Sequence, residues 1–262
     1  MQIVFIGAGN LATQVSQAFV RAGHQVLQVF SRTQESASAL AVRLGCDWTT
    51  SFDEVRTDAQ LYVISVRDAA LQQVAVDLYE SLSERQNGVE GGTGFNALFV
   101  HTAGSMSVDL IPMQRRGVFY PMQTFSKHRD VDFSRIPIFI ESVTDHDLLH
   151  ALASELTQSV YTLNGSSRKY LHVAAVFACN FTNHLYDLSS RILEEHDIPF
   201  DVMLPLIEET ARKVHSMSPR EAQTGPAVRY DEVVMHRHQK MLSDEKMKRI
   251  YQLLSESIHD KL

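Results

Sequence analysis

The first twenty residues change pattern abruptly around a glycine-rich hexapeptide. Ile3–Ile6 form a short apolar run, which is typical of a strand buried on both faces. From Leu11 onward the apolar residues recur at helical spacing, and Gly7-Ala8-Gly9-Asn10-Leu11-Ala12 lies between the two patterns. We therefore predict a strand, a tight turn and a helix, which is the unit from which parallel α/β sheets are built.

The hexapeptide fits the G-x-G-x-x-A pattern of dinucleotide-binding turns. Gly7 permits a tight turn, Gly9 lets the backbone approach a pyrophosphate, and the amides that open the helix favour its negative charge. Its position between a strand and a helix is the context that this motif requires. We predict cofactor contacts from Gly7, Ala8, Gly9, Asn10 and Leu11. A tight turn without a ligand is the alternative.

The next apolar run, Gln25–Phe30, predicts the second strand and ends in Ser31, Arg32 and Thr33. An NAD site usually places an acid here to hold the ribose hydroxyls. A guanidinium and two hydroxyls suit a 2′-phosphate instead. We predict NADP as the cofactor, bound in part by these three residues. Arg32 as a solvated surface charge is the alternative.

Composition narrows the class of protein. A net charge of −7 argues against a nucleic-acid partner. We expect no membrane span, because no stretch of about eighteen apolar residues occurs. The N-terminus shows no signal peptide, and Cys46 and Cys179 form no paired motif, so we expect a cytoplasmic protein. The histidines show no metal-ligand spacing, and we predict no metal site.

Strand and helix patterns alternate through the first part of the chain and give way to helices after Gly165. We predict an α/β protein with a Rossmann-type parallel sheet in residues 1–163 and an all-helical domain in residues 164–262. The predicted helices of the second domain cover residues 168–196, 202–214 and 226–241, and Ser243 is expected to cap a last one. Residues 84–94 are rich in glycine and polar side chains and predict a surface loop.

Ligands of open α/β sheets bind beyond the carboxyl ends of the strands. Two further predicted strands end in Ser65-Val66-Arg67-Asp68 and in His101-Thr102-Ala103-Gly104-Ser105. We predict that Ser65, Val66 and His101 lie at the cofactor and that Ser105 contacts the substrate. For His101, a structural role in the core is an equal alternative.

The helix predicted for residues 168–196 carries a narrow polar seam. At 100° per residue, Lys169, His172, Asn180, Asn183 and Asp187 share one stripe, and the flanking faces are apolar. We expect this helix to be buried on most sides. Buried amides and imidazoles need partners, which a ligand or a neighbouring helix can supply.

Thr224-Gly225-Pro226 resembles a helix start, because proline is favoured at the first helical position. The free amides there and Arg229 could hold a substrate carboxylate. A plain capping turn is the alternative for Thr224.

Several blocks along the chain resemble a known group of proteins. "IGAGNLA" is similar to the start of the pyrroline-5-carboxylate reductase and 3-hydroxyisobutyrate dehydrogenase superfamily. "HTAGS", "YPMQTFS", "KYLHVAAVFACNFTNHLYDL", "PLIEET" and "TGPAVRYD", in this order, resemble a bacterial branch of Rossmann-like NADP oxidoreductases with a C-terminal domain of unknown function. The chain departs from that branch at Tyr120, where His is common, and at Tyr230, where Gly is common. It also lacks the superfamily's close Lys-x-x-x-Asn pair.

The resemblance implies an NADP-dependent oxidoreductase that dimerises through its helical domain. We expect hydride transfer between NADP(H) and a small, anionic carbonyl, hydroxyl or imine substrate. His172 is the expected acid/base, since an imidazole ordinarily titrates near pH 6.5, with Asn180 and Lys169 as helpers. His101 remains open as the alternative acid/base. A non-catalytic NADP-sensing protein is the alternative function.

Overall fold

The computed structural model of the chain describes residues 1–87 and 96–260. It divides into two compact units, Met1–Val176 and Phe177–Leu262. The domain boundary expected after residue 163 falls just before the first helix of the helical part, and it stays a prediction. Among the described residues, no helix is both long and apolar enough to cross a membrane.

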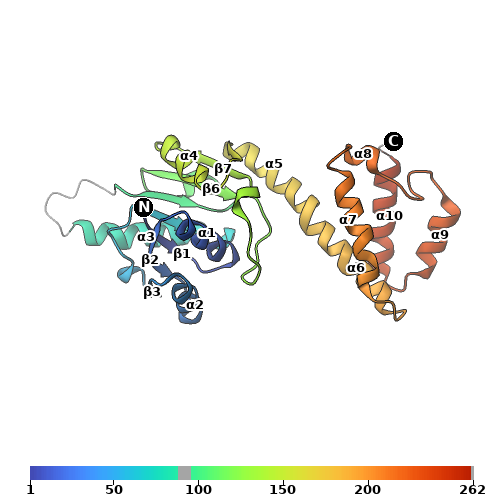
Figure 1. Cartoon of the computed structure of the whole chain (residues 1–262), viewed down its shortest axis with the longest axis horizontal. Coiled ribbons are helices and arrows are strands. Elements are labelled where there is room, and N and C mark those ends of the chain that lie inside the picture. Colours follow the sequence, from blue (N-terminus) through green and yellow to red (C-terminus); the bar gives the residue numbers. More distant parts are fainter. Residues whose placement is uncertain (88–95, 261–262) are drawn as a thin grey trace. The chain divides into compact units, whose positions relative to one another are not determined.

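The first unit is built on an eight-stranded sheet in the order β3-β2-β1-β4-β5-β6-β7-β8. Figure 1 labels β1, β2, β3, β6 and β7 of this sheet. The strands are β1 (Gln2–Ile6), β2 (Gln25–Phe30), β3 (Asp47–Thr49), β4 (Leu61–Ile64), β5 (Leu98–His101), β6 (Arg116–Pro121), β7 (Ile138–Ser142) and β8 (Val160–Thr162). Neighbours from β3 to β6 pair in parallel. Their carboxyl ends therefore meet along one edge of the sheet.

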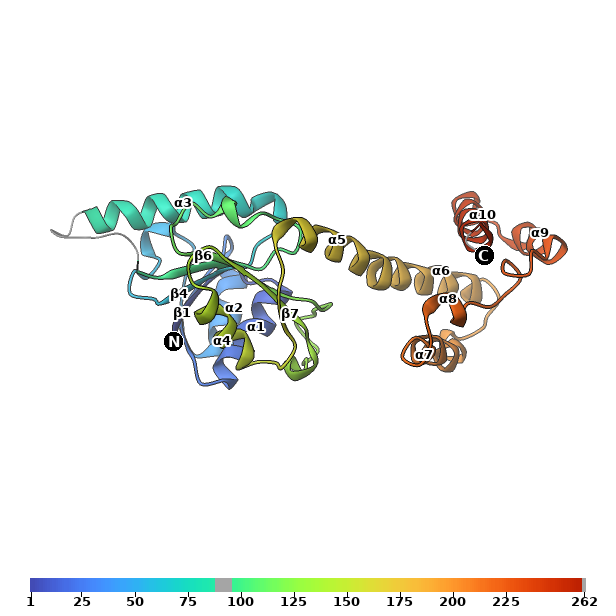
Figure 2. The same cartoon turned by 90° about the horizontal axis from the view of Figure 1, so that it is seen from above.

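The buried strands supply a core on each face of the sheet, because successive side chains point to opposite sides. In β1, Ile3 and Phe5 enter one apolar cluster and Val4 and Ile6 enter the other. The first cluster is covered by α1 (Asn10–Arg21), α2 (Gln34–Leu44) and α4 (His146–Ser154), and the second by α3 (Asp68–Asn87). Figure 2 shows α3 on one side of the sheet and the other three helices on the opposite side.

The predicted α/β class with a helical second part is confirmed, but the sheet is not parallel throughout. β7 pairs antiparallel with β6, and β8 pairs in parallel with β7, so the last two strands run opposite to the rest. The β6–β7 connection contains only the short 3-10 helix Phe133–Arg135, and an antiparallel neighbour needs no crossover helix. Of the loop predicted for residues 84–94, residues 84–87 belong to α3 and the remainder lies outside the described residues.

The helices that follow the sheet are α5 (Gly165–Ala175), α6 (Thr182–Glu194), α7 (Leu204–Lys213), α8 (Pro219–Ala222), α9 (Glu232–Met241) and α10 (Glu245–His259). Two predicted helix starts are wrong. α9 begins at Glu232 and not at Pro226, because Tyr230 adopts a φ of 50°, which interrupts a helix. Asp244 and not Ser243 caps α10, and its carboxylate accepts hydrogen bonds from the amides of Lys246 and Met247.

The helix predicted as continuous over residues 168–196 is interrupted by a π-helical segment, Val176–Phe181. Its i→i+5 hydrogen bonds place more residues in each turn than an α-helix does, so a stripe drawn at 100° per residue loses its phase there. The expectation that this helix is buried on most sides is also wrong for a single chain. Phe177 is 65% exposed, and Asn180, Asn183 and Asp187 are exposed as well.

Arg168 anchors the start of α5 to the sheet. Its side chain is fully buried, its guanidinium pairs with Glu141 of β7, and it donates a further hydrogen bond to the carbonyl of Met106. A buried guanidinium is costly unless its charge and its N–H groups are satisfied. These contacts therefore fix where α5 leaves the sheet.

His101, at the end of β5, is a structural residue of the core. Its side chain is fully buried, its Nδ1 accepts a hydrogen bond from the Ala103 amide at 3.2 Å, and its Nε2 donates to the Ser107 carbonyl at 3.2 Å. Burial, helped by the charge of Arg168, lowers the pKa of His101 to about 4. The neutral ring thus holds the loop that follows β5.

We expect the first unit to lose stability as the pH falls through the titration range of His101. In the unfolded chain the imidazole takes up a proton near pH 6.5, whereas in the folded chain it does so only near pH 4. His101 therefore adds about 3 kcal/mol to the free energy of unfolding above about pH 6.5, and this contribution is lost as the pH falls to about 4.

The measurement is denaturant unfolding between pH 4 and 7.5, followed by the fluorescence of Trp48, the single tryptophan. His101→Gln should be less stable than the wild type at pH 7.5. Its free energy of unfolding should also fall much less between pH 6.5 and pH 4 than that of the wild type. His150→Gln, which removes an exposed imidazole from α4, is the control. An unchanged pH slope in His101→Gln would contradict the assignment.

Candidate functional site

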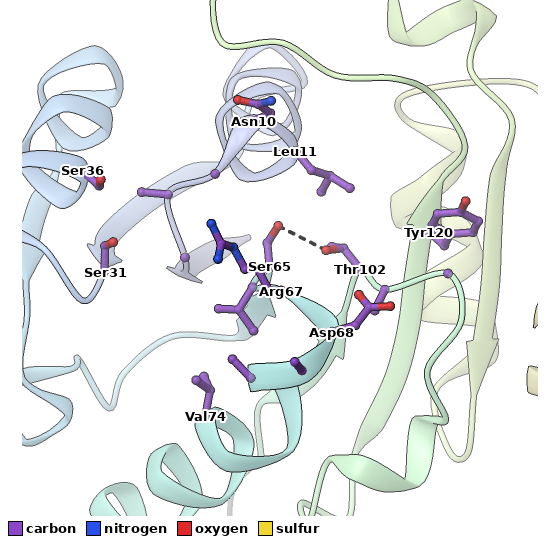
Figure 3. Close-up of a pocket in the computed structure, with 18 of the residues that line it drawn as sticks. Asn10, Leu11, Ser31, Ser36, Ser65, Arg67, Asp68, Val74, Thr102 and Tyr120 are labelled. Carbon is purple, nitrogen blue, oxygen red and sulfur yellow. Dashed lines mark hydrogen bonds between the residues drawn. The ribbon is translucent and has the colours of Figure 1, made fainter. Parts of the chain in front are cut away.

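A cavity of about 800 Å³ lies at the carboxyl ends of β1, β2, β4 and β5 (Figure 3). All of its lining residues belong to the first unit. They include Gly7 to Leu11, Ser31, Arg32, Ser36, Ser65 to Ala70, Thr102 to Gly104, Tyr120, Gln123, Lys127 and His172. This is the position at which open α/β sheets bind ligands.

Gly7 allows the β1–α1 loop, which lines the cavity, to lie close to the end of β4. Its φ is +119°, and an added Cβ would lie 2.1 Å from the Ser65 carbonyl oxygen. The β1–α1 loop therefore lies directly on the end of β4, at a distance that only glycine permits. Ser65 in turn accepts a hydrogen bond from the Thr102 hydroxyl at 3.2 Å, which joins the ends of β4 and β5 (Figure 3).

The start of α1 offers a binding site for an anion. Its N-cap residue, Gly9, makes no side-chain capping bond, and the first turn contains no acid. Nothing lies within 4 Å of a Cβ built on Gly9, so the backbone there is open to the cavity. Unpaired amides at a helix N-terminus suit a pyrophosphate, and these residues fit the dinucleotide that the sequence predicts.

Ser31, Arg32 and Ser36 line the cavity beyond the end of β2. Thr33 does not line it, because its hydroxyl caps α2 by accepting a hydrogen bond from the Ser36 amide at 3.4 Å. Hydroxyls and a guanidinium, with no carboxylate in the described lining beyond β2, suit a 2′-phosphate better than free ribose hydroxyls. This end of the cavity therefore fits NADP.

A tyrosine and a histidine meet near the ends of β5 and β6. The Tyr120 hydroxyl lies 3.2 Å from Nδ1 of His172, and both residues line the cavity. Gly104 makes this approach possible, since a Cβ there would lie 2.6 Å from the Tyr120 ring and 2.9 Å from Nδ1 of His172. Burial first, and then the charge of Asp68, raise the pKa of Tyr120 above its ordinary value. The phenol is therefore protonated at neutral pH and can donate.

Asp68 is the one carboxylate in the described lining of the cavity, and it accepts a hydrogen bond from the Ser105 hydroxyl at 2.6 Å. The charged lining residues also include Arg32, Arg67 and Lys127. Across residues 1–87 and 96–260, no three His, Cys, Asp or Glu side chains come together as a metal site would need. The charge balance of the cavity therefore favours an anionic ligand.

The structure brings most of the predicted site residues to this cavity, but not all of them. Those that line it are Gly7, Ala8, Gly9, Asn10, Leu11, Ser31, Arg32, Ser65, Val66 and His172. Thr33, His101, Ser105 and Lys169 belong to the first unit but lie outside the lining. Asn180, Thr224 and Arg229 are exposed residues of the second unit.

Sequence reasoning missed several lining residues, among them Ser36, Tyr120, Gln123 and Lys127. Arg67, Asp68, Thr102 and Gly104 lie in the two strand-end segments that the sequence singled out, although no separate role was predicted for them. For Lys127, no local pattern pointed to the cavity.

We predict that Gly9→Val abolishes NADPH binding without unfolding the chain. The space around the Gly9 Cβ position is free of protein atoms, so a valine fits the folded chain but occupies the volume that a pyrophosphate needs. Calorimetric titration with NADPH and the thermal midpoint of the variant test both halves of this expectation. Micromolar binding retained by a folded variant would show that the pyrophosphate does not lie on this loop.

Two family models match the chain. The model described as "NADP oxidoreductase coenzyme F420-dependent" matches residues 2–88, and a domain of unknown function (DUF2520) matches residues 136–258. A sequence comparison with curated proteins finds no match.

Solved structures resemble the chain over nearly its whole length. A Bacteroides fragilis protein, provisionally named an NADP oxidoreductase, is 49% identical with a TM-score of 0.90, covering 99% of this chain and 98% of its own. An imine reductase from Myxococcus stipitatus in complex with NADP+ is 14% identical with a TM-score of 0.64, covering 99% and 92%. A pyrroline-5-carboxylate reductase from Coxiella burnetii is 12% identical with a TM-score of 0.56, covering 99% and 96%.

The two reductases share only the fold with this chain, since their identities are low. The Bacteroides fragilis protein is a relative along the entire sequence. Together with the two matched models, it shows that the chain belongs to the family of NADP oxidoreductases in which a Rossmann-like domain is followed by this C-terminal domain of unknown function.

Proposed function

We propose that the chain transfers a hydride between NADP(H) and a small, anionic carbonyl, hydroxyl or imine compound, with His172 as the acid/base. The observation that carries the proposal is the Tyr120–His172 pair in a cavity whose other features fit NADP. NADP supplies the hydride when it is bound, and the protein must hold the substrate and handle the proton.

His172 is suited to move a proton because its hydrogen-bond partner fixes its ring. In its protonated form the imidazole carries a proton on both nitrogens. With Nδ1–H donating to the Tyr120 oxygen, the Nε2 proton can pass to a substrate atom, which leaves the neutral ring. Tyr120 stays protonated near neutral pH because burial and Asp68 raise its pKa. The phenol therefore steadies one form of the imidazole and remains available as a second donor.

Two observations favour His172 over the alternatives. Both ring nitrogens of His101 are occupied by backbone groups, and the residue lies outside the cavity lining. His172, by contrast, is half-buried and lines the cavity, which favours catalysis over a sensing role. The proposal also includes Lys169 and Asn180 as helpers of His172, and Arg229 with Thr224 as a clamp for the substrate carboxylate. All four side chains are exposed, and they lie on the helices and turns after the sheet.

The test is a screen of small keto acids, imines and their neutral analogues for loss of NADPH absorbance, followed by variants on the best substrate. We expect His172→Ala to lose about 10²–10⁴-fold in turnover at saturating NADPH, because general acid–base catalysis contributes about that much. Tyr120→Phe should lose less, since it removes a partner and leaves the imidazole in place.

His101→Ala and His150→Ala are the comparison variants and should keep turnover within about tenfold of the wild type. A loss below about tenfold in folded His172→Ala would exclude it as the acid/base. A loss in folded His101→Ala as large as in His172→Ala would favour the other histidine. Preference for neutral over anionic substrates would overturn the substrate class.

We also propose that the protein works as a homodimer formed through its second unit. Among the described residues 177–260, the buried apolar side chains are only Leu188, Ala227 and Met247. Many large apolar side chains of the same unit are exposed: Phe177, Phe181, Leu185, Ile198, Val202, Leu204, Leu206, Val214, Met217, Tyr230, Val233, Met241, Leu253 and Leu254. So much exposed apolar surface is typical of an interface, and the family resemblance favours a second copy as its cover.

Sedimentation equilibrium should give twice the chain mass of 29.5 kDa at micromolar concentration. Leu206→Glu combined with Leu253→Glu should shift the protein toward monomer, because each introduces a charge on an exposed apolar helix. Val42→Glu, on the exposed side of α2 in the first unit, is the matched control and should leave the mass unchanged. A monomeric wild type at tens of micromolar would contradict the proposal.

A further inference from the structure

Lys127 lines the cavity although it is distant in sequence from every predicted cofactor contact. It follows β6, whereas the expected contacts for a 2′-phosphate follow β2. Its side chain is half-buried, and across residues 1–87 and 96–260 no carboxylate forms an ion pair with it. A half-buried lysine without an acidic partner thus lines a cavity that fits a phosphate-rich ligand.

The loop that carries Lys127 is fastened to α1 on both sides of this residue. The Asn10 side-chain amide donates to the Phe125 carbonyl at 3.0 Å, and that of Gln14 donates to the Ser126 carbonyl at 2.7 Å and to the Arg129 carbonyl at 3.1 Å. Gln14 is only 1% exposed, so its amide is committed to this loop. The backbone of the loop is therefore held against the start of α1.

A third contact places the loop beside α2. Arg43, in the last turn of α2, donates to the carbonyl of Lys127 itself at 3.1 Å. α2 is also the helix whose first turn carries Ser36, and Arg32 lies next to its N-cap residue, Thr33. The loop of Lys127 is thus held against both α1 and α2, and Lys127 lines the same cavity as Ser31, Arg32 and Ser36.

We propose that Lys127 is a cofactor-specificity residue that completes the site for the 2′-phosphate of NADP, together with Ser31, Arg32 and Ser36. A phosphate dianion presents more acceptor positions than one guanidinium fills, and an ammonium supplies a compact second charge. Thr33 cannot share this role while its hydroxyl caps α2. The inference rests on the NADP site of the proposed function and adds a contact from a separate loop.

The contacts also give Asn10 and Gln14 a defined part in this site. Their amides do not need to reach a phosphate, because they hold the loop that delivers the Lys127 ammonium. A phosphate bound between Arg32 and Lys127 would connect the end of β2 to the loop after β6. Discrimination between NADP and NAD then depends on two segments of the chain, and Arg32 alone does not account for it.

The experiment is calorimetric titration of the full chain with NADPH, NADH, adenosine 2′,5′-bisphosphate and adenosine 5′-monophosphate. Lys127→Ala should weaken NADPH and the bisphosphate about tenfold or more, which corresponds to losing one charged hydrogen bond. NADH and the monophosphate should change by less than about twofold, because they lack the 2′-phosphate. Lys127→Glu should weaken NADPH further, and Arg32→Ala should show the same selectivity as Lys127→Ala.

Arg129→Ala is the matched control. It removes the same charge from the same loop, its side chain is exposed and outside the cavity lining, and the carbonyl that Gln14 binds is retained. NADPH affinity should be unchanged in this variant. Circular dichroism and the thermal midpoint verify that each variant is folded.

Three results would overturn the inference. Equal losses for NADPH and NADH in Lys127→Ala would assign the ammonium to the pyrophosphate, and an unchanged NADPH affinity in that variant would exclude any contact. An equal loss of NADPH affinity in Arg129→Ala would show that the effect comes from the net charge of the loop and not from a contact of Lys127. A wild type that binds neither NADPH nor NADH would instead overturn the proposed function itself, before any variant is compared.

Discussion

The contact between the β1–α1 loop and the end of β4 determines the rest of the site. Gly7 approaches the Ser65 carbonyl at a distance that excludes any side chain. That approach lowers the loop onto the sheet edge, and it leaves the start of α1 facing an open cavity. A residue with a Cβ at position 7 would lift the loop from β4, and the amides of α1 would no longer share a cavity with the ends of β4 and β5.

A second close approach organises the opposite end of the cavity. Gly104 lies so near to both rings that Tyr120 and His172 meet across it. His172 stands on α5, one helical turn after Arg168, whose buried pairing with Glu141 fixes that helix to β7. A buried ion pair contributes little net stability compared with apolar packing, but it tolerates few alternative geometries. The Arg168–Glu141 pair therefore serves mainly to fix the position of the His172 imidazole.

The sequence predicts the parts of this structure whose cause is local. The strand–turn–helix unit, the cofactor loop and the absence of an acid after β2 follow from short stretches of residues, and the cavity contains Gly7, Gly9 and Arg32. The contributions of Tyr120 and Lys127 depend instead on strand order and on loop contacts between segments far apart in the chain. The seam beyond His172 could not be followed by helical spacing, because the π-helical segment Val176–Phe181 shifts its phase. The reversed β7 and β8 had no local signal either.

The charges of the cavity are sorted along its length, although the chain as a whole carries −7. Arg32 follows β2 together with Ser31 and Ser36. Figure 3 shows Arg67 between these two serines and the group of Asp68, Thr102 and Tyr120. One end of the cavity is thus cationic and the other contains a carboxylate. A phosphate-rich ligand is therefore favoured in one orientation, because the reversed orientation would place its phosphates next to Asp68. Burial, and then the same carboxylate, raise the pKa of Tyr120 and so keep the phenol protonated at this end of the cavity. One acid thus contributes both to the orientation of a cofactor and to the protonation of the phenol beside His172.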